Sequence, residues 1–218
     1  MRIKTLLCLA ALTAGVATSM AQSNVYSLNV VGYVNVVCSN GYTLVNTPLV
    51  PTNNSIVSLL DAYVPNGGAV YTFNGTVFQT IAKDEFDGTW SAPATQLPNG
   101  KGYFIRNPTA TPFTVTYVGE VPQGSLTNNP GAGYTLMGSQ VPQAGFLQSD
   151  LAFGSGNGDQ LLRFANGGFI TYAKDEFDGT WSGPGANSAG GPPLKVGEGF
   201  FYRNLSGSAT WVRTFTVQ

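Results

Sequence analysis

Short runs of β-branched and aromatic residues, broken by turn-forming residues, make up most of this chain. One example is residues 69–81, AVYTFNGTVFQTI, in which two such runs flank an Asn-Gly dipeptide at positions 74–75. Asn-Gly favours the positive φ values of a type I′ turn, so this segment predicts a β-hairpin with a two-residue loop. The runs 102–106 and 113–118 predict two further strands, because both are rich in β-branched and aromatic residues and lie between turn signals.

One segment is predicted to be helical. Residues 55–63, SIVSLLDAY, start with an N-cap candidate, Ser55, carry an apolar stripe and are followed by Pro65. The corresponding part of the second half of the chain, residues 149–153, is shorter and predicts a short helical piece or only a turn.

A sequence repeat divides the chain into two similar halves. The ten residues 82–91, AKDEFDGTWS, recur unchanged at 173–182. Blocks around this decapeptide recur in the same order at nearly constant spacing, which indicates a duplicated module. The recurring blocks are 41–44 and 133–136 (both GYTL), 74–75 and 166–167 (both NG), and 100–107 and 197–204 (GKGYFIRN and GEGFFYRN).

We therefore predict an all-β protein with two tandem repeats of a small β-sandwich-like or barrel-like module, and at most one short helix per repeat. β module 1 is expected at residues 22–121 and β module 2 at residues 122–218. The segments 26–34, 114–121 and 211–217 resemble one another. The middle segment is therefore expected either to be shared between the modules or to close the first one.

The N-terminus has the pattern of a secretory signal peptide. A short basic start, MRIK, precedes an uncharged and mostly apolar run at 5–16, and small residues stand at Ser19 and Ala21. This pattern predicts a signal peptide at residues 1–21 that is cleaved after Ala21. The apolar run is too short to span a bilayer, so we expect no membrane anchor. The mature protein is expected to be secreted, either extracellular or at the cell surface, with the periplasm as an alternative.

Charge and composition exclude several classes of function. Charged residues make up 10% of the chain, and removal of Arg2 and Lys4 from the ten basic residues leaves eight against eleven acidic ones. Such a chain lacks the basic surface that nucleic acid requires. The sequence contains no histidine, which excludes Ser-His-Asp and Cys-His catalysis and most zinc sites. Cys38, the one cysteine left after cleavage, is predicted to be buried, with an intermolecular disulfide as the alternative.

The two decapeptides hold six of the eleven acidic residues, and three interpretations fit them. Clustered carboxylates on a glycine-containing loop could bind calcium, the one cofactor considered. Alternatively, Asp-Gly forms a hairpin turn, Phe86 packs against Trp90 across it, and the acids lie in water. In the third interpretation, Asp87 and Asp178 face each other as the paired acids of a hydrolase. The candidate residues are Asp84, Glu85, Asp87, Asp175, Glu176 and Asp178.

Trp90 and Trp181, one in each decapeptide, are candidates for carbohydrate binding. Exposed aromatic rings stack on the faces of sugars through apolar contact. The alternative is that both indoles are buried in the core of a small β module.

The order of these motifs resembles an uncharacterised tandem β module of exported bacterial surface proteins. The motifs are Gly-Tyr-Thr-Leu followed by Pro48-Leu49, the Asn-Gly hairpin, Trp-Ser, and Gly-x-Gly-(Tyr/Phe)-Phe, and they cover most of the mature chain. The resemblance implies an extracellular, non-enzymatic β module and brings no catalytic residues.

The expected function is therefore a structural or adhesive role at the cell surface or in the extracellular matrix. Self-assembly or an extracellular polysaccharide would supply the partner, because two copies of one module provide two contacts. A carbohydrate- or calcium-dependent binding module is the alternative, and a hydrolase that uses paired acidic residues comes third.

Overall fold

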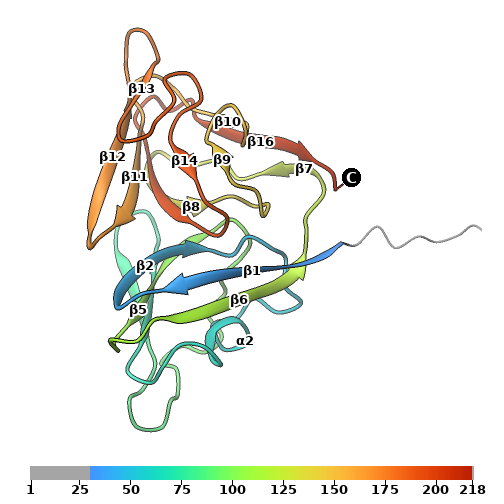
Figure 1. Ribbon diagram of the computed structural model, residues 1–218, viewed down its shortest axis with the longest axis vertical. Coiled ribbons are helices and arrows are strands. Elements are labelled where there is room, and N and C mark those ends of the chain that lie inside the picture. The colour runs from blue at the N-terminus through green and yellow to red at the C-terminus, as the bar shows by residue number, and fades with distance from the viewer. Residues whose placement is uncertain (1–29, 218) are drawn as a thin grey trace, which may run out of the picture.

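The computed structural model describes residues 30–217, so the predicted signal peptide lies outside the described residues. Antiparallel β-strands dominate both halves of the chain, which lie one above the other in Figure 1. The strands of the first half are β1 (Val31–Cys38), β2 (Gly41–Asn46), β3 (Ala69–Phe73), β4 (Phe78–Ala82), β5 (Gly102–Asn107) and β6 (Phe113–Glu120). The strands of the second half are β7 (Gly124–Thr127), β8 (Gly133–Gly138), β9 (Gly145–Phe146), β10 (Phe153–Gly154), β11 (Gln160–Ala165), β12 (Gly168–Lys174), β13 (Trp181–Ser182), β14 (Pro193–Leu194), β15 (Gly199–Asn204) and β16 (Thr210–Phe215).

Each half contains one main sheet with the same arrangement of hydrogen-bonded strands. The order is β2-β5-β3-β4 in the first half and β8-β15-β11-β12-β13 in the second. The registers also agree, since Gly41 lies opposite Asn107 and Gly133 lies opposite Asn204. The prediction of an all-β protein is confirmed, and each sheet in residues 30–217 is open.

A two-stranded ribbon packs beside the main sheet of the first half. β1 pairs with β6 along its whole length, from Val31 opposite Glu120 to Cys38 opposite Phe113. In the second half β16 pairs with β7. The segment 114–121 was expected either to be shared between the modules or to close the first one. It closes the first half, because β6 pairs with β1.

The core of the first half lies between the β1–β6 ribbon, the helix and one face of the main sheet. Tyr103 and Ile105 of β5, Val115 and Tyr117 of β6 and Cys38 of β1 are all buried there. Burial raises the pKa of the Cys38 thiol to about 11, although a hydrogen bond with Thr43 acts in the opposite direction. The prediction that Cys38 is buried is confirmed.

One short helix, α2 (Ile56–Leu60), occurs within residues 30–217. The Ser55 hydroxyl caps it by accepting a hydrogen bond from the Ser58 backbone N at 3.3 Å, as the sequence predicts. The helix ends three residues before the predicted end at Tyr63, and the segment 149–153 contains a turn at 149–151 and no helix. In the part of the chain that the structure describes, no helix is long and apolar enough to cross a membrane.

The two Asn-Gly hairpins differ in their loops. In the second half, Asn166 and Gly167 have φ values of 51° and 77° between paired Ala165 and Gly168, as a type I′ turn requires. In the first half, strand pairing ends at Phe73 and Phe78, so the loop has four residues and the predicted two-residue turn is wrong. The Asn74 side chain accepts hydrogen bonds from the backbone N atoms of Thr76 and Val77 instead, at 3.0 Å each.

The two halves contact each other through the second faces of their main sheets. The Asn46 backbone N donates to Gly197 O, and the Gly138 backbone N donates to Gly100 O, at 2.9 Å each. These two bonds join corresponding blocks of the repeat in opposite directions, so the halves meet in a nearly two-fold arrangement. Two glycines allow this approach: a Cβ on Gly199 would lie 2.4 Å from Val45 O, and one on Gly102 would lie 2.8 Å from the Met137 N.

Candidate functional site

The acidic loop of the first decapeptide is held together by its own carboxylates. Asp84 Oδ1 accepts hydrogen bonds from the backbone N atoms of Phe86 and Asp87, at 2.7 and 3.0 Å. Asp87 Oδ1 accepts from the backbone N and the hydroxyl of Thr89, at 2.8 and 2.7 Å. These are the bonds of Asx turns, in which a carboxylate fixes the backbone that follows it.

The second decapeptide forms the same loop with the same bonds. Asp175 accepts from the backbone N atoms of Phe177 and Asp178, and Asp178 accepts from the N and hydroxyl of Thr180. These contacts lower the pKa of Asp178, chiefly through the Thr180 hydroxyl. The pKa of Asp87 is lowered in the same way, chiefly through the backbone N–H of Thr89. Hydrogen bonds within each decapeptide therefore fix most of its loop, and an asparagine from outside adds one more, from Asn66 to Glu85 O in the first loop and from Asn157 to Glu176 O in the second.

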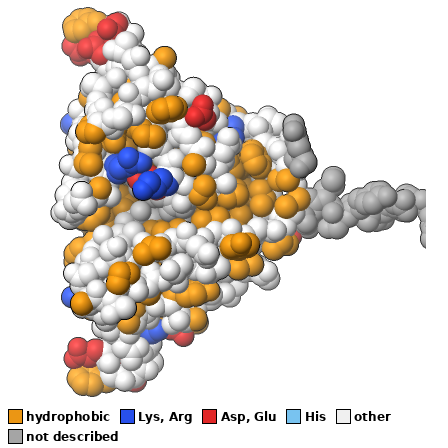
Figure 2. All heavy atoms as spheres, in the orientation of Figure 1, with side chains coloured by type: hydrophobic (Ala, Val, Ile, Leu, Met, Phe, Trp, Pro, Cys, Tyr) orange, Lys and Arg blue, Asp and Glu red, His pale blue; other side chains and the backbone are white. Residues whose placement is uncertain are grey.

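The two acidic loops lie far from each other. Acidic and hydrophobic side chains protrude together at the top and at the bottom of the molecule in Figure 2, where these loops are found. The prediction that Asp87 and Asp178 face each other across a cleft is therefore wrong. Within residues 30–217, no group of three or more acidic or cysteine side chains is placed to hold a metal ion. The structure thus does not gather Asp84, Glu85 and Asp87, or Asp175, Glu176 and Asp178, into a calcium site.

Each loop carries an exposed phenylalanine at its apex. Phe86 and Phe177 are both 87% exposed. The expectation that Phe86 packs against Trp90 across the turn is wrong, because Trp90 points into the core while Phe86 points into solvent. We call the segments 84–89 and 175–180 the tip loops.

Both decapeptide tryptophans are buried, 6% exposed for Trp90 and 4% for Trp181. Trp90 Nε1 donates a hydrogen bond to Asp61 Oδ1 at 2.8 Å, and Trp181 Nε1 donates to Gln148 Oε1. The prediction that these indoles bind carbohydrate is wrong, because neither ring face is open to a sugar. The alternative interpretation, burial in the core, is confirmed.

Aromatic rings that were not among the predicted site residues gather where the two halves meet. Phe104 and Phe201, which occupy the same position in the block repeated at 100–107 and 197–204, lie with ring centroids 6.4 Å apart. Phe164 packs edge-on against Phe104 at 5.2 Å, and Phe73 packs edge-on against Phe201 at 5.3 Å. Phe73 and Phe164 both stand nine residues before a decapeptide, so the same contact occurs twice across the interface.

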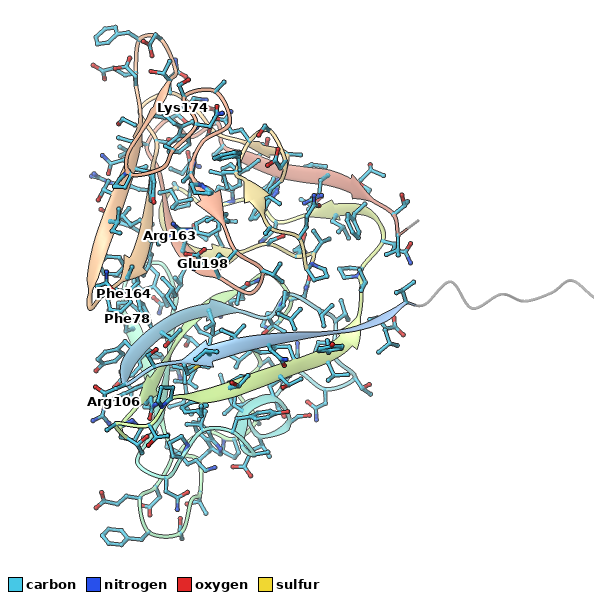
Figure 3. The ribbon with its side chains drawn as sticks, in the orientation of Figure 1. Phe78, Arg106, Arg163, Phe164, Lys174 and Glu198 are labelled. Carbon is cyan, nitrogen blue, oxygen red and sulfur yellow. The ribbon has the colours of Figure 1, made fainter. Side chains whose placement is uncertain are left out.

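One side of this aromatic cluster opens to solvent as a hollow of about 500 Å³. Its lining is almost entirely aromatic, and we call it the aromatic hollow. It is lined by Tyr42, Tyr71, Phe78, Thr80, Phe104, Phe164, Gly167 and Phe169. Phe78 and Phe169 at its rim are 47% and 48% exposed, and they lie on the two hairpins that come from different halves. Figure 3 shows Phe78 and Phe164 side by side where these hairpins meet.

One basic side chain, Arg106, lies beside the aromatic hollow. Arg106 lies opposite Tyr42 in the β2–β5 register, and it donates one hydrogen bond to Gly67 O at 3.1 Å. Within residues 30–217, Arg106 forms no salt bridge with a carboxylate. Burial, together with the neighbouring Tyr42, raises the pKa of Tyr71, while Arg106 acts to lower it. Figure 3 places Arg106 on the same side of the molecule as Phe78 and Phe164.

A partly buried ion pair in the second half was also not predicted. Arg163 Nη2 lies 2.9 Å from Glu198 Oε2, and the two side chains are only 17% and 15% exposed. Each partner forms one further hydrogen bond: Arg163 donates to the Pro193 carbonyl oxygen, and Glu198 accepts from the Lys195 backbone N at 2.9 Å. This pair joins β11 to the loop before β15 (Figure 3), and its groups already have partners, so we assign it a structural role.

A signal for the aromatic interface is present in the sequence. Residues 103–105, Tyr-Phe-Ile, are apolar at consecutive positions, which is typical of a strand buried on both faces. A second covering layer is therefore implied on the face that carries Phe104. The sequence does not indicate what that layer is, because the partner is the corresponding face of the other half.

Comparison with known proteins gives no match to this chain, whether with family models, with curated proteins or with solved structures.

Proposed function

We propose that this protein is a secreted structural protein of the cell surface or extracellular matrix that acts by self-assembly and not by catalysis. The observation that carries this proposal is the pair of tip loops. Each loop presents an 87% exposed phenylalanine among carboxylates, and the two loops protrude at opposite ends of the molecule (Figure 2).

An exposed phenylalanine on a fixed loop is suited to docking. The Asx-turn hydrogen bonds hold the backbone of each tip loop before any contact forms, so little conformational entropy remains to be lost on binding. Burying one such ring contributes about 1.5–3 kcal/mol. Two identical tips on one molecule allow two contacts at once, which increases avidity without a second kind of surface.

The second candidate function is a carbohydrate-binding module, and the aromatic hollow is the observation that favours it. Aromatic rings stack on sugar faces, and Tyr42, Tyr71 and Thr80 add hydroxyl groups to the lining. This candidate replaces the predicted tryptophan site with a site between the two halves.

Self-association of the mature chain tests the proposed function. Sedimentation velocity of residues 22–218, from micromolar to millimolar concentration and without added ligand, is expected to show assemblies that grow with concentration. The double variant Phe86→Ser/Phe177→Ser is expected to weaken association at least about tenfold, because about 1.4 kcal/mol corresponds to a factor of ten.

A matched control removes two exposed apolar side chains elsewhere. Val57 and Leu205 are 42% and 52% exposed, and the variant Val57→Ser/Leu205→Ser is expected to assemble like the wild type. A wild-type chain that stays monomeric over the whole concentration range would contradict the proposed function.

A further inference from the structure

We propose that the aromatic hollow of one molecule receives the tip phenylalanine, Phe86 or Phe177, of a second copy of this chain. This inference rests on the proposed function and names the two surfaces that make the contact. The first argument is that the tip and the hollow are chemically complementary. A benzyl group that is 87% exposed and a lining of six aromatic rings occur on the same molecule.

The ring geometry of the hollow suits one more phenylalanine. Aromatic pairs prefer edge-to-face contacts with centroids about 4.5–7 Å apart. The rings that line the hollow already take this geometry: Phe104 and Phe164 cross at 89° and Phe78 and Phe104 at 61°. Phe104 is buried, but Tyr42, Phe78 and Phe169 are each nearly half exposed, so they offer ring surface to an incoming ring in the same geometry. The volume of about 500 Å³ lies within the range of about 300–1,000 Å³ that is typical of binding pockets.

The polar groups of the hollow favour a phenylalanine over a sugar. A sugar carries hydroxyl groups on its whole perimeter, and these need hydrogen-bond partners when they leave water. Among the residues that line the hollow, the hydroxyl groups of Tyr42, Tyr71 and Thr80 are the only polar side-chain groups. A benzyl group has no polar atoms, so it needs no hydrogen-bond partner in the hollow.

Charge supports the same pairing. Each tip loop carries three carboxylates around its phenylalanine, from Asp84, Glu85 and Asp87 in the first loop. The Arg106 guanidinium stands beside the hollow and forms no salt bridge within the described residues. An acidic tip that enters the hollow therefore approaches a cation, and this attraction both steers the encounter and fixes the orientation of the loop.

The contact must form between different molecules. The tip loops lie at the two ends of the long axis, whereas the hairpins that carry Phe78 and Phe164 meet near its middle (Figure 3). Because the tip and the hollow are different surfaces, one contact leaves the hollow of the donor molecule and the tips of the acceptor molecule free to bind further copies. Each molecule can donate tips and also accept one, so assemblies are expected to grow with concentration.

Variants that separate the two surfaces test this inference. Thr80 is exposed and lines the hollow, so Thr80→Glu places a negative charge where the acidic tip would enter. Gln79 is the exposed neighbour outside the lining, and Gln79→Glu is the control with the same change in charge. Thr80→Glu is expected to weaken assembly at least tenfold, and Gln79→Glu is expected to assemble like the wild type. Phe169→Ser is a second hollow variant if Thr80→Glu does not fold.

Mixing the defective variants is the decisive experiment. Phe86→Ser/Phe177→Ser keeps the hollow but lacks the tips, while Thr80→Glu keeps the tips but lacks the hollow. Each alone is expected to sediment as a monomer, and an equimolar mixture is expected to form a small complex of one tip donor with one or two acceptors. Unchanged thermal midpoints show that the variants are folded.

The outcomes distinguish the two proposals. Monomeric wild type contradicts the proposed function and this inference together. Wild-type assembly that persists in both variants, or a mixture that forms no complex, overturns this inference and leaves self-assembly through another surface. A mixture that forms no complex while an oligosaccharide perturbs the tyrosine resonances of the hollow assigns the hollow to a sugar and also overturns it.

Discussion

Each tryptophan of the repeated decapeptide is held by a hydrogen-bond acceptor that lies outside the decapeptide. Asp61, directly after α2, accepts from Trp90, and it also forms a 3.0 Å ion pair with Lys83. Lys83 Nζ donates in addition to the backbone oxygens of Asp61 and Val64, at 2.6 and 3.0 Å. The ammonium group is therefore buried with partners on several sides, while the Asp61 side chain stays 48% exposed.

Substitution Asp61→Asn tests this network through its pH dependence. Hydrogen bonds from Lys83 and then Trp90 lower the pKa of Asp61, so the charged carboxylate contributes stability above about pH 4 that is lost as the pH falls through its folded-state pKa. At pH 7 the variant is expected to lose about 1 kcal/mol of unfolding free energy, a modest value because the carboxylate is half exposed. The difference from wild type is expected to shrink in acid.

Urea unfolding at neutral and acidic pH measures this difference, and Glu85→Gln, in an exposed loop, is the control. A difference that is equally large at both pH values would contradict this account.

At the residue scale, the two acidic loops are predictable from the sequence, but the roles of their aromatic residues are not. The Asp-Gly turns are predictable, because the Asx-turn bonds lie within the decapeptide itself. The burial of Trp90 and Trp181 depends on Asp61 and Gln148, which only the tertiary fold brings to the indoles. Because the Trp90 indole points into the core, Phe86 is left in solvent. The local sequence does not show which of these two aromatic rings is buried and which is exposed.

The strands were predictable as elements, but the register of one hairpin was not. Both hairpins pair phenylalanines five residues apart, Phe73 with Phe78 and Phe164 with Phe169. Relative to these rings, Asn-Gly stands one position earlier in the first half than in the second. The strand register that places the phenylalanines on the interface thus determines the length of the loop. In the first half this register overrides the preference of Asn-Gly for a two-residue turn.

Two substitutions in the second hairpin test this view of its turn. Asn166 has a φ of 51°, a left-handed conformation that asparagine tolerates and alanine does not, so Asn166→Ala is expected to cost about 1 kcal/mol. Gly168 has room for a Cβ and pairs with Ala165 as a strand residue, so Gly168→Ala is expected to be neutral or slightly stabilising. Urea unfolding of both variants measures the difference. Equal midpoints would show that the turn conformation is not maintained in solution.

At the scale of the whole molecule, the repeat provides the surface that unites the two halves. Each half has its own core, and a separate aromatic cluster joins them. The duplicated blocks are visible in the sequence, and so is the apolar run 103–105 that makes β5 apolar on both faces. The sequence does not show that the two repeats cover each other, because this depends on close backbone approach at Gly102 and Gly199.

Gly199→Ala tests whether this approach makes the two halves unfold together. The new Cβ would lie 2.4 Å from Val45 O across the interface, and backbone on both sides cannot move aside as a flexible side chain would. We expect a loss of about 1–3 kcal/mol, the usual cost of overpacking. The loss falls on the interface and not on either core, so the wild type is expected to unfold in one calorimetric transition and the variant in two. Gly168→Ala, which adds the same methyl group in open space, is the control. A variant that keeps one transition at the midpoint of this control would show that close backbone approach at Gly199 does not couple the halves, and that the aromatic cluster and the other contacts between the halves suffice to make them unfold together.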